Sequence, residues 1–305
     1  MRLALFFCVC EGEYEIAWEA LVSLLRSCKQ HEVALFILDD ASPSRVGKRL
    51  AERVKSERDM PIECIELEKS LGFRGTAWRA FHGLAQIAKA ARNFDLVIKI
   101  DADALVLRED LGAFIATACP DGRGLYGELR AMRWRDRLLY AADQLPAGFT
   151  REAVDGVIQH KWKLARRKPV WWADVGRRAF RNGFRFGYIG GCFWFLGGQT
   201  LATLHGAGLL DRDQAQHGFV FNDDLLLTTA VLGIGHPVVD LATLSPSFGG
   251  TMSMSERFPL DEVLRRRPFV VHPLKNNPEA WQRREQLRTH FPGLWPAPAS
   301  MREMS

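Results

Sequence analysis

The first 129 residues alternate between short apolar segments and longer segments that carry an apolar residue every three or four positions. The short segments are rich in β-branched and aromatic residues, which is typical of buried strands. They predict strands at residues 3–9, 33–38, 62–67, 96–100 and 125–128. The longer segments are typical of amphipathic helices, such as one with Ser42 as its N-cap and Pro43 at its first position. This alternation predicts βαβ units around a parallel sheet, an α/β fold.

The alternation stops after residue 129. Between Arg130 and Arg185 there are 14 Lys or Arg and 5 Asp or Glu, a local charge of +9 in a chain whose net charge is +5. This segment is helical in tendency and contains four tryptophans, so residues 130–186 are predicted to be a basic helical insertion. Strand and helix patterns return over residues 187–275. The last element predicted in this segment is a strand that ends near His272. Residues 276–305 are predicted to be a C-terminal helix and tail.

Composition places the chain among ordinary globular proteins, with 47% hydrophobic and 25% charged residues over 305 positions. Six cysteines without metal-ligand spacing favour reduced thiols and a cytoplasmic protein. The apolar start of the chain reads as a strand, because no small-residue cleavage site follows it. Residues 187–210 lack Asp, Glu, Lys and Arg but hold seven glycines, so a strand, a turn and a helix explain them better than a membrane span.

Two pairs of aspartates follow predicted strands. Asp39 and Asp40 follow the second strand, and Asp101 and Asp103 follow the fourth. Ligands bind beyond the carboxyl ends of the strands in such sheets, so we expect these four carboxylates at one edge. Residues i and i+2 of an extended segment point the same way and can aim two oxygens at one Mg²⁺ or Mn²⁺ ion. The alternative for the second pair is a solvated strand end at which Asp103 caps a helix.

A glycine-containing segment, residues 69–75, follows the third strand and would let the backbone approach a nucleotide. The sequence contains no G-x-G-x-x-G fingerprint and no P-loop. The sequence therefore argues against dinucleotide binding and against ATP hydrolysis of the P-loop type.

In order and spacing, these motifs resemble those of GT-A fold glycosyltransferases, nearest to the family 2 type. Residues 39–42 (Asp-Asp-Ala-Ser) resemble the family's Asp-Asp-Gly-Ser segment, and Asp101-Ala102-Asp103 resembles its Asp-x-Asp metal motif. Gly190-Gly191 and Asn222-Asp223-Asp224 are similar to its donor-facing glycines and acidic pair. The Gln-x-x-Arg-Trp signature of processive synthases is missing. The resemblance covers residues 2–129 well, 187–232 moderately and the basic insertion not at all.

The resemblance implies a GT-A, Rossmann-like, mixed and mostly parallel sheet flanked by helices. Residues 1–129 would be its nucleotide-sugar-binding half and residues 187–275 its acceptor-side half. It implies an inverting, non-processive transferase that moves a sugar from a nucleotide-diphosphate donor, a UDP-sugar being favoured, to a hydroxyl of a glycan or lipid-linked acceptor. Mn²⁺ or Mg²⁺ would be the cofactor.

The resemblance also assigns roles to residues. Asp101, Asp103 and a C-terminal histidine, here His272 with His236 as the fallback, would hold the metal. Asp224, or its neighbour Asp223, would be the catalytic base. The implied donor contacts are Asp39, Asp40, Gly72, Arg74, Arg79, Asp101, Gly190 and Gly191.

Other interpretations stay open at this point. One is a Mg²⁺-dependent phosphotransferase of the haloacid dehalogenase type. Its Asp-x-Asp motif normally ends the first core strand, whereas two or three βα units precede Asp101 here. A nucleotidyltransferase lacks its expected glycine-rich loop here, and a non-catalytic nucleotide-binding module would keep the fold without turnover. The basic insertion is either a solvated face with its aromatics turned inward or a peripheral contact with the anionic inner face of a membrane. No nucleic-acid-binding motif is present.

Overall fold

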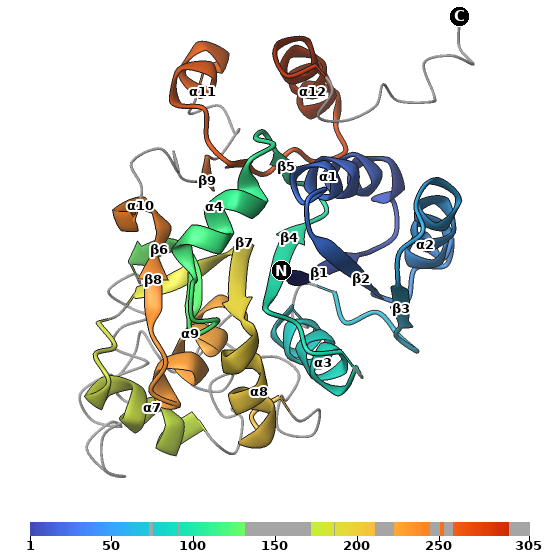
Figure 1. Cartoon of the computed structure of the whole chain (residues 1–305). Helices are drawn as coiled ribbons and strands as arrows, with labels where there is room; N and C mark the ends of the chain where they lie inside the picture. Colours follow the sequence, from blue (N-terminus) through green and yellow to red (C-terminus); the bar gives the residue numbers. More distant parts are fainter. Residues whose placement is uncertain are drawn as a thin grey trace, which may run out of the picture. The chain divides into compact units, whose positions relative to one another are not determined.

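The computed structural model describes residues 1–72, 76–90, 92–131, 172–185, 187–210, 223–244, 251–252 and 259–292. Figure 1 shows the helices and strands of these residues. Contacts along the chain group it into two compact units. Unit 1 comprises Met1–Ser70, Phe94–Pro120 and Leu241–Ser305, and unit 2 comprises Leu71–Asn93 and Asp121–Asp240. Among the described helices, none is long and apolar enough to cross a membrane.

Unit 1 is built on four parallel strands in the order β3 (Ile62–Glu66), β2 (Glu32–Asp39), β1 (Arg2–Val9) and β4 (Leu96–Asp101). The two central strands, β1 and β2, are apolar and buried along almost their whole length, as expected for strands covered on both faces. Helix α1 (Tyr14–Ser27) connects β1 to β2 and helix α2 (Val46–Glu57) connects β2 to β3, and both bury their apolar faces.

A second, three-stranded sheet in unit 1 has the order β5 (Leu105–Val106), β10 (Val270–Val271) and β9 (Thr251–Met252). It joins the segment after β4 to the C-terminal part of the chain. The remaining helices of unit 1 are α4 (Leu111–Ala118), α10 (Leu241–Leu244), α11 (Leu260–Arg266) and α12 (Pro278–His290).

Unit 2 contains β7 (Gly187–Gly197), β6 (Leu125–Ala131) and β8 (Val238–Asp240) in that order. β6 is antiparallel to β7 and parallel to β8, and a bulge interrupts the β6–β7 register between Gly127 and Leu129. The described residues of this unit include the helices α3 (Thr76–Lys89), α7 (Trp172–Arg181), α8 (Gly198–Gly206) and α9 (Asp223–Gly233). α9 packs against α3, α7 and β7.

The predicted fold class is confirmed: β3, β2, β1 and β4 pair in parallel, β6 and β7 pair antiparallel, and helices flank the strands. The five predicted N-terminal strands are all present. The helix predicted to begin at Pro43 begins at Val46 instead. Residues before it form a turn, in which Arg45 N donates to Ser42 O at 2.9 Å and Arg45 has φ 51°. Ser42 still accepts a hydrogen bond from Val46 N, at 2.7 Å.

Candidate active site

The carboxyl ends of β2, β1 and β4 form one edge of the parallel strands in unit 1. Asp39 is in register with Val9 across β1–β2, and Asp101 is in register with Cys8 across β1–β4. Two strand spacings, roughly 10 Å, therefore separate the ends of β2 and β4. The prediction that both aspartate pairs follow strands at the same edge is confirmed by this register.

A cluster of three side chains, Asp101, Asp103 and His272, lies at the end of β4. The Nε2 atom of His272 is 3.1 Å from Asp103 Oδ1 and 3.6 Å from Asp101 Oδ2. One ligand atom from each residue lies within 4.8 Å of the others. All three side chains are partly exposed, so solvent reaches the cluster. Two carboxylates and one imidazole fit a divalent cation such as Mn²⁺ or Mg²⁺, with remaining positions open.

The backbone of the second sheet brings His272 to Asp103. β5 and β10 are antiparallel, with Leu105 opposite Val271. Continuing this pairing past the strand ends, Leu274 N donates to Asp103 O at 2.7 Å. His272 is thus placed by main-chain hydrogen bonds that run on both sides of it.

Charged groups around the cluster shift the pKa of Asp103 and of the nearby Glu13. Burial alone would raise the pKa of Asp103, but the hydrogen bond and charge of His272, together with Lys275, hold that pKa below its usual value. The ammonium of Lys99 hydrogen-bonds Asp101 Oδ1, and the Lys99 side chain is 6% exposed. Burial raises the pKa of Glu13, and the charges of Asp103 and Asp101 add to that effect. Asp103 is therefore ionised and ready to bind a cation.

Sequence reasoning missed Lys99 and Glu13. The signal for Lys99 was present, because it is the one charged residue inside the apolar run 96–100 and lies two residues before Asp101 on the same face. Glu13 gave no comparable signal, since its position depends on the turn that follows β1.

Asp39 and Asp40 are both buried but differ in their partners. Asp39 accepts hydrogen bonds from Ser42 N, Ser42 Oγ and Gly47 N, each at 2.7 Å. Asp40 Oδ2 accepts one from Ser70 Oγ at 2.9 Å. The carboxylate of Asp39 thus organises the start of α2. The nucleoside contacts predicted for both residues stay predictions.

In unit 2, two adjacent glycines of β7 each make room for a charged side chain. A Cβ atom at Gly191 would lie 1.9 Å from Asp224 Oδ1, and one at Gly190 would lie 2.8 Å from Arg130 Nε. Asp224 therefore lies against the backbone of Gly191, as α9 packs on β7. Burial alone would lower the pKa of Arg130, but Cys192, Glu128 and Asp224 together raise it. Asp223 begins α9, and its side chain lies outside the described atoms.

The other predicted donor contacts also belong to unit 2. Gly72 is exposed with φ +55°, and Arg79 is half-buried in α3. Arg74 lies outside the described residues. His236, the fallback metal ligand, is buried in unit 2, and its Nδ1 is 2.8 Å from Thr200 Oγ1. That these unit 2 residues and Asp224 lie close to the Asp101 cluster of unit 1 stays a prediction.

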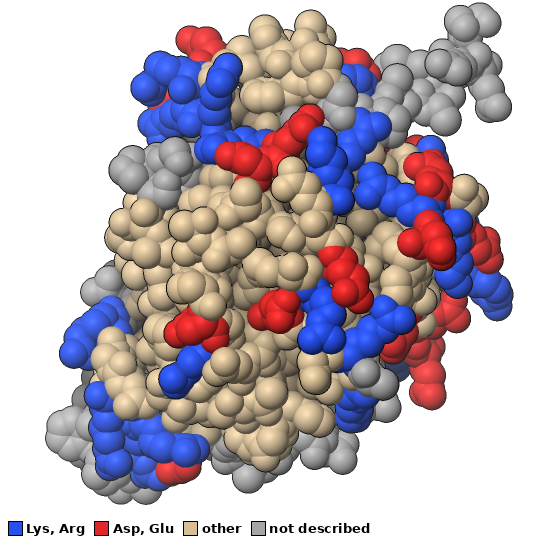
Figure 2. Space-filling view, in the orientation of Figure 1, with Lys and Arg blue, Asp and Glu red and all other residues tan. Residues whose placement is uncertain are grey.

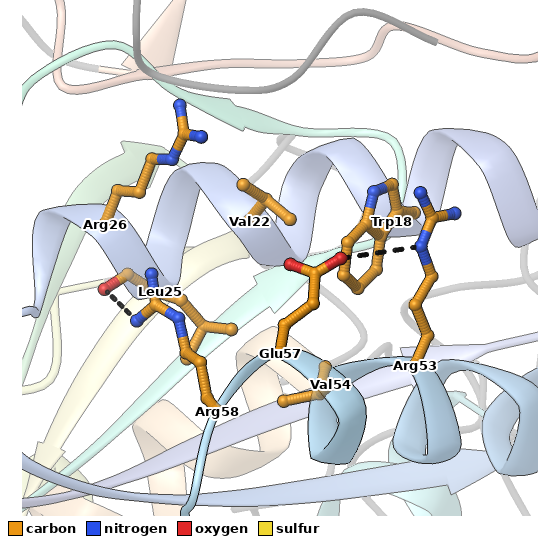
Figure 3. Close-up of a pocket in the computed structure, with 8 residues that line it drawn as sticks. All are labelled: Trp18, Val22, Leu25, Arg26, Arg53, Val54, Glu57 and Arg58. Carbon is orange, nitrogen blue, oxygen red and sulfur yellow. Dashed lines mark hydrogen bonds and ion pairs between the residues drawn. The ribbon is translucent and has the colours of Figure 1, made fainter. Parts of the chain in front are cut away.

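A pocket of ≈ 130 Å³ in unit 1 lies between α1 and α2 (Figure 3). Its lining includes Trp18 of α1 and Arg53 of α2, whose guanidinium carbon is 3.9 Å from the centroid of the Trp18 ring. None of the predicted site residues lines it. This pocket is therefore separate from the Asp101 cluster.

The sequence matches no family model and no curated protein. Solved structures similar to the chain are glycosyltransferases. The bifunctional glycosyltransferase WbbM is 11% identical with a TM-score of 0.48, and the match covers 90% of this chain and 46% of that one. The galactosyltransferase LgtC, solved with donor and acceptor sugar analogues, is 13% identical with a TM-score of 0.45, covering 98% and 99% of the two chains.

A third similar structure is the mannosyltransferase PcManGT from Pyrobaculum calidifontis, solved with GDP-Man and Mn²⁺. It is 16% identical with a TM-score of 0.45, and the match covers 93% of this chain and 60% of that one. The chain thus spans about half the length of WbbM and three fifths of PcManGT.

Proposed function

We propose that this protein is a metal-dependent, inverting and non-processive glycosyltransferase. Its donor is a nucleotide-diphosphate sugar, with UDP-sugars favoured, and its acceptor is a hydroxyl of a glycan or lipid-linked molecule. One observation carries the proposal: Asp101, Asp103 and His272 converge at the same strand edge at which Asp40 follows β2. That edge combines a cation site with a carboxylate for a nucleoside.

The chain's own groups would bind and orient the donor. Asp103 and His272, with Asp101, would hold Mn²⁺ or Mg²⁺, and this cation would neutralise the negative charge that develops on the leaving diphosphate. Asp40, buried and bonded to Ser70, would accept a hydrogen bond from the ribose or base. Lys99 would hold Asp101 in place, because it bonds one oxygen of that carboxylate and leaves the other facing His272.

Asp224 is proposed as the catalytic base. The acceptor oxygen would attack the anomeric carbon on the face opposite the diphosphate, the bond from that carbon to the diphosphate oxygen would break, and the acceptor proton would pass to Asp224. Configuration would invert. A positioned base of this kind contributes typically ~10² to 10⁴-fold. The absence of a side chain at Gly191 would leave space for Asp224 and the acceptor.

Donor turnover tests the proposal. The protein is incubated with UDP-, GDP-, CMP- and dTDP-sugars, with Mn²⁺ or with a chelator, and release of free nucleotide is measured. We expect release from one donor class that depends on Mn²⁺ and falls in Asp103→Asn and Asp224→Asn. Asp110→Asn is the matched control, because Asp110 is exposed and paired with Arg108 away from the cluster. Phosphate release from a generic ester, without nucleotide release, would instead favour the phosphotransferase.

A further inference from the structure

We infer that Arg284 of α12 is a positioning residue for the Asp101 cluster, the side chains of Asp101, Asp103 and His272. It would act through the backbone of the segment that carries His272. The inference rests on the proposed metal site of the glycosyltransferase and assigns to its C-terminal helix a part in metal binding. All the residues involved belong to unit 1.

The guanidinium of Arg284 is fully buried and bonded on two sides. Its Nη1 donates to Glu19 Oε2 at 2.7 Å, and its Nη2 donates to the carbonyl oxygen of Leu274 at 2.6 Å. A buried guanidinium is costly unless it is paired, so this geometry is strongly fixed by its partners. Arg284 thus connects α1, through Glu19, to the segment that follows β10.

Leu274 connects Arg284 to the Asp101 cluster by two main-chain hydrogen bonds. Its carbonyl accepts from Arg284, while its N–H donates to the carbonyl of Asp103 at 2.7 Å. His272 lies two residues before Leu274, and its Nε2 is 3.1 Å from Asp103 Oδ1. A shift of Leu274 would therefore change the distance between two of the three ligands. Partners that orient metal ligands typically contribute 10- to 100-fold to metal affinity.

The pKa of Arg284 also reflects the charge of Asp103 in the Asp101 cluster. Burial lowers the pKa of Arg284, and the charges of Glu19 and then Asp103 oppose that effect. The guanidinium therefore lies within electrostatic reach of the cluster.

The same helix offers a matched control in Arg288. Its Nη2 donates to the other oxygen of Glu19, Oε1, at 2.6 Å, and its Nη1 bonds Glu285. Among the described residues, Arg288 has no hydrogen bond to residues 272–274. A variant at Arg288 thus removes a similar guanidinium from the same helix and the same glutamate without touching the His272 segment.

The test measures the affinity of Mn²⁺ alone by calorimetry, at a temperature well below unfolding. Arg284→Lys keeps the charge but cannot donate to Glu19 and Leu274 in the guanidinium geometry, so we expect about 10-fold weaker Mn²⁺ binding or more. Arg284→Met should weaken it further. Arg288→Lys should stay within about twofold of the unmodified protein, on the same scale.

Three outcomes would overturn the inference. Unchanged Mn²⁺ affinity in Arg284→Lys would show that the Leu274 contact does not position the ligands. Equal losses in the Arg284 and Arg288 variants would assign the effect to the docking of α12 as a whole. No Mn²⁺ binding by the unmodified protein would instead refute the metal site and the proposed function with it. If Arg284→Met fails to fold, Arg284→Lys decides the question.

Discussion

Asp39 and Asp40 are neighbours at the end of β2, yet their carboxylates have different hydrogen-bond partners. Three donors, two from Ser42 and one from Gly47, already bond the Asp39 carboxylate. Gly47 also has to be a glycine, since a Cβ there would lie 2.9 Å from Asp39 Cβ. Asp40 bonds Ser70 through one oxygen. We therefore expect stability to depend more on Asp39, whereas the proposed function assigns donor binding to Asp40.

This difference gives the first prediction. Asp39→Asn places an amide N–H₂ against backbone or hydroxyl donors, and a buried donor left without an acceptor costs about 1–3 kcal/mol. We expect that loss in the free energy of unfolding, measured by urea titration. Asp40→Asn should weaken binding of the nucleotide, measured by calorimetry. The assignment of the two roles is wrong if Asp39→Asn is as stable as the unmodified protein.

The acidic residues of the candidate metal site could be predicted because their position after apolar runs is a local signal. His272 could be predicted only through the resemblance to GT-A enzymes, since its neighbourhood to Asp103 depends on pairing between β5 and β10. The positions of Glu13 and Arg284 depend on packing between elements far apart in the sequence. No local pattern specifies such contacts.

At the scale of elements, the packing of α9 on β7 brings Asp224 against Gly191. An alanine at position 191 would place its Cβ 1.9 Å from Asp224 Oδ1, which is closer than atoms can approach. Asp224 would have to move, and a displaced base loses its part in proton transfer. The pair of glycines is thus the part of β7 on which the proposed chemistry depends.

We therefore predict that Gly191→Ala lowers kcat on the order of 10²-fold. Gly206→Ala is the matched control, because a Cβ at that position meets no atom within 4 Å. Steady-state kinetics with the active donor would measure both. A Gly191→Ala protein with unchanged kcat would contradict the role of Asp224 as base.

Secondary structure could be predicted well where elements were long. The two-residue strands β5 and β9 are too short to show alternation, and only their pairing reveals them. A last strand near His272 was predicted, and β10 lies directly before that residue. The start of α2 was predicted at Pro43 because Ser-Pro is a common helix start. The hydrogen bonds of Asp39 instead hold residues 42–45 in a turn and delay the helix to Val46.

At the scale of the whole molecule, charge is unevenly distributed. Most of residues 130–186 lie outside the described chain, but α7 and the residues after it are described. Figure 2 shows Lys and Arg side chains gathered over α7. Val175 and Ala179 are buried, whereas four arginines on the same stretch are exposed: Arg177, Arg178, Arg181 and Arg185. α7 therefore presents a basic face to solvent.

This face gives a prediction about membrane contact. The protein should co-sediment with anionic liposomes at low salt, and the triple variant Arg177→Gln, Arg178→Gln, Arg181→Gln should bind them less, because each basic residue near an anionic surface contributes about 1 kcal/mol. Arg265→Gln with Arg266→Gln, on α11, is the control. Equal partitioning to neutral and anionic liposomes would argue for a solvated face.

The predicted boundaries, at residues 129, 186 and 275, stay predictions. The two compact units are each assembled from separated stretches of chain, and unit 1 includes both the N-terminal strands and the C-terminal helix α12. Such interleaving arises from long-range pairing, as between β5 and β10, which hydrophobic periodicity along the chain does not encode.

Donor binding with and without Mn²⁺ tests the central claim most directly. In a thermal-shift panel of UDP-, GDP-, CMP- and dTDP-sugars, a ligand at 100 times its Kd stabilises the folded state by about 2.7 kcal/mol. We predict a shift for one nucleotide class that requires Mn²⁺ and disappears in Asp103→Asn. A shift of equal size in the presence of a chelator and in Asp103→Asn, or no shift with any donor, would contradict the account.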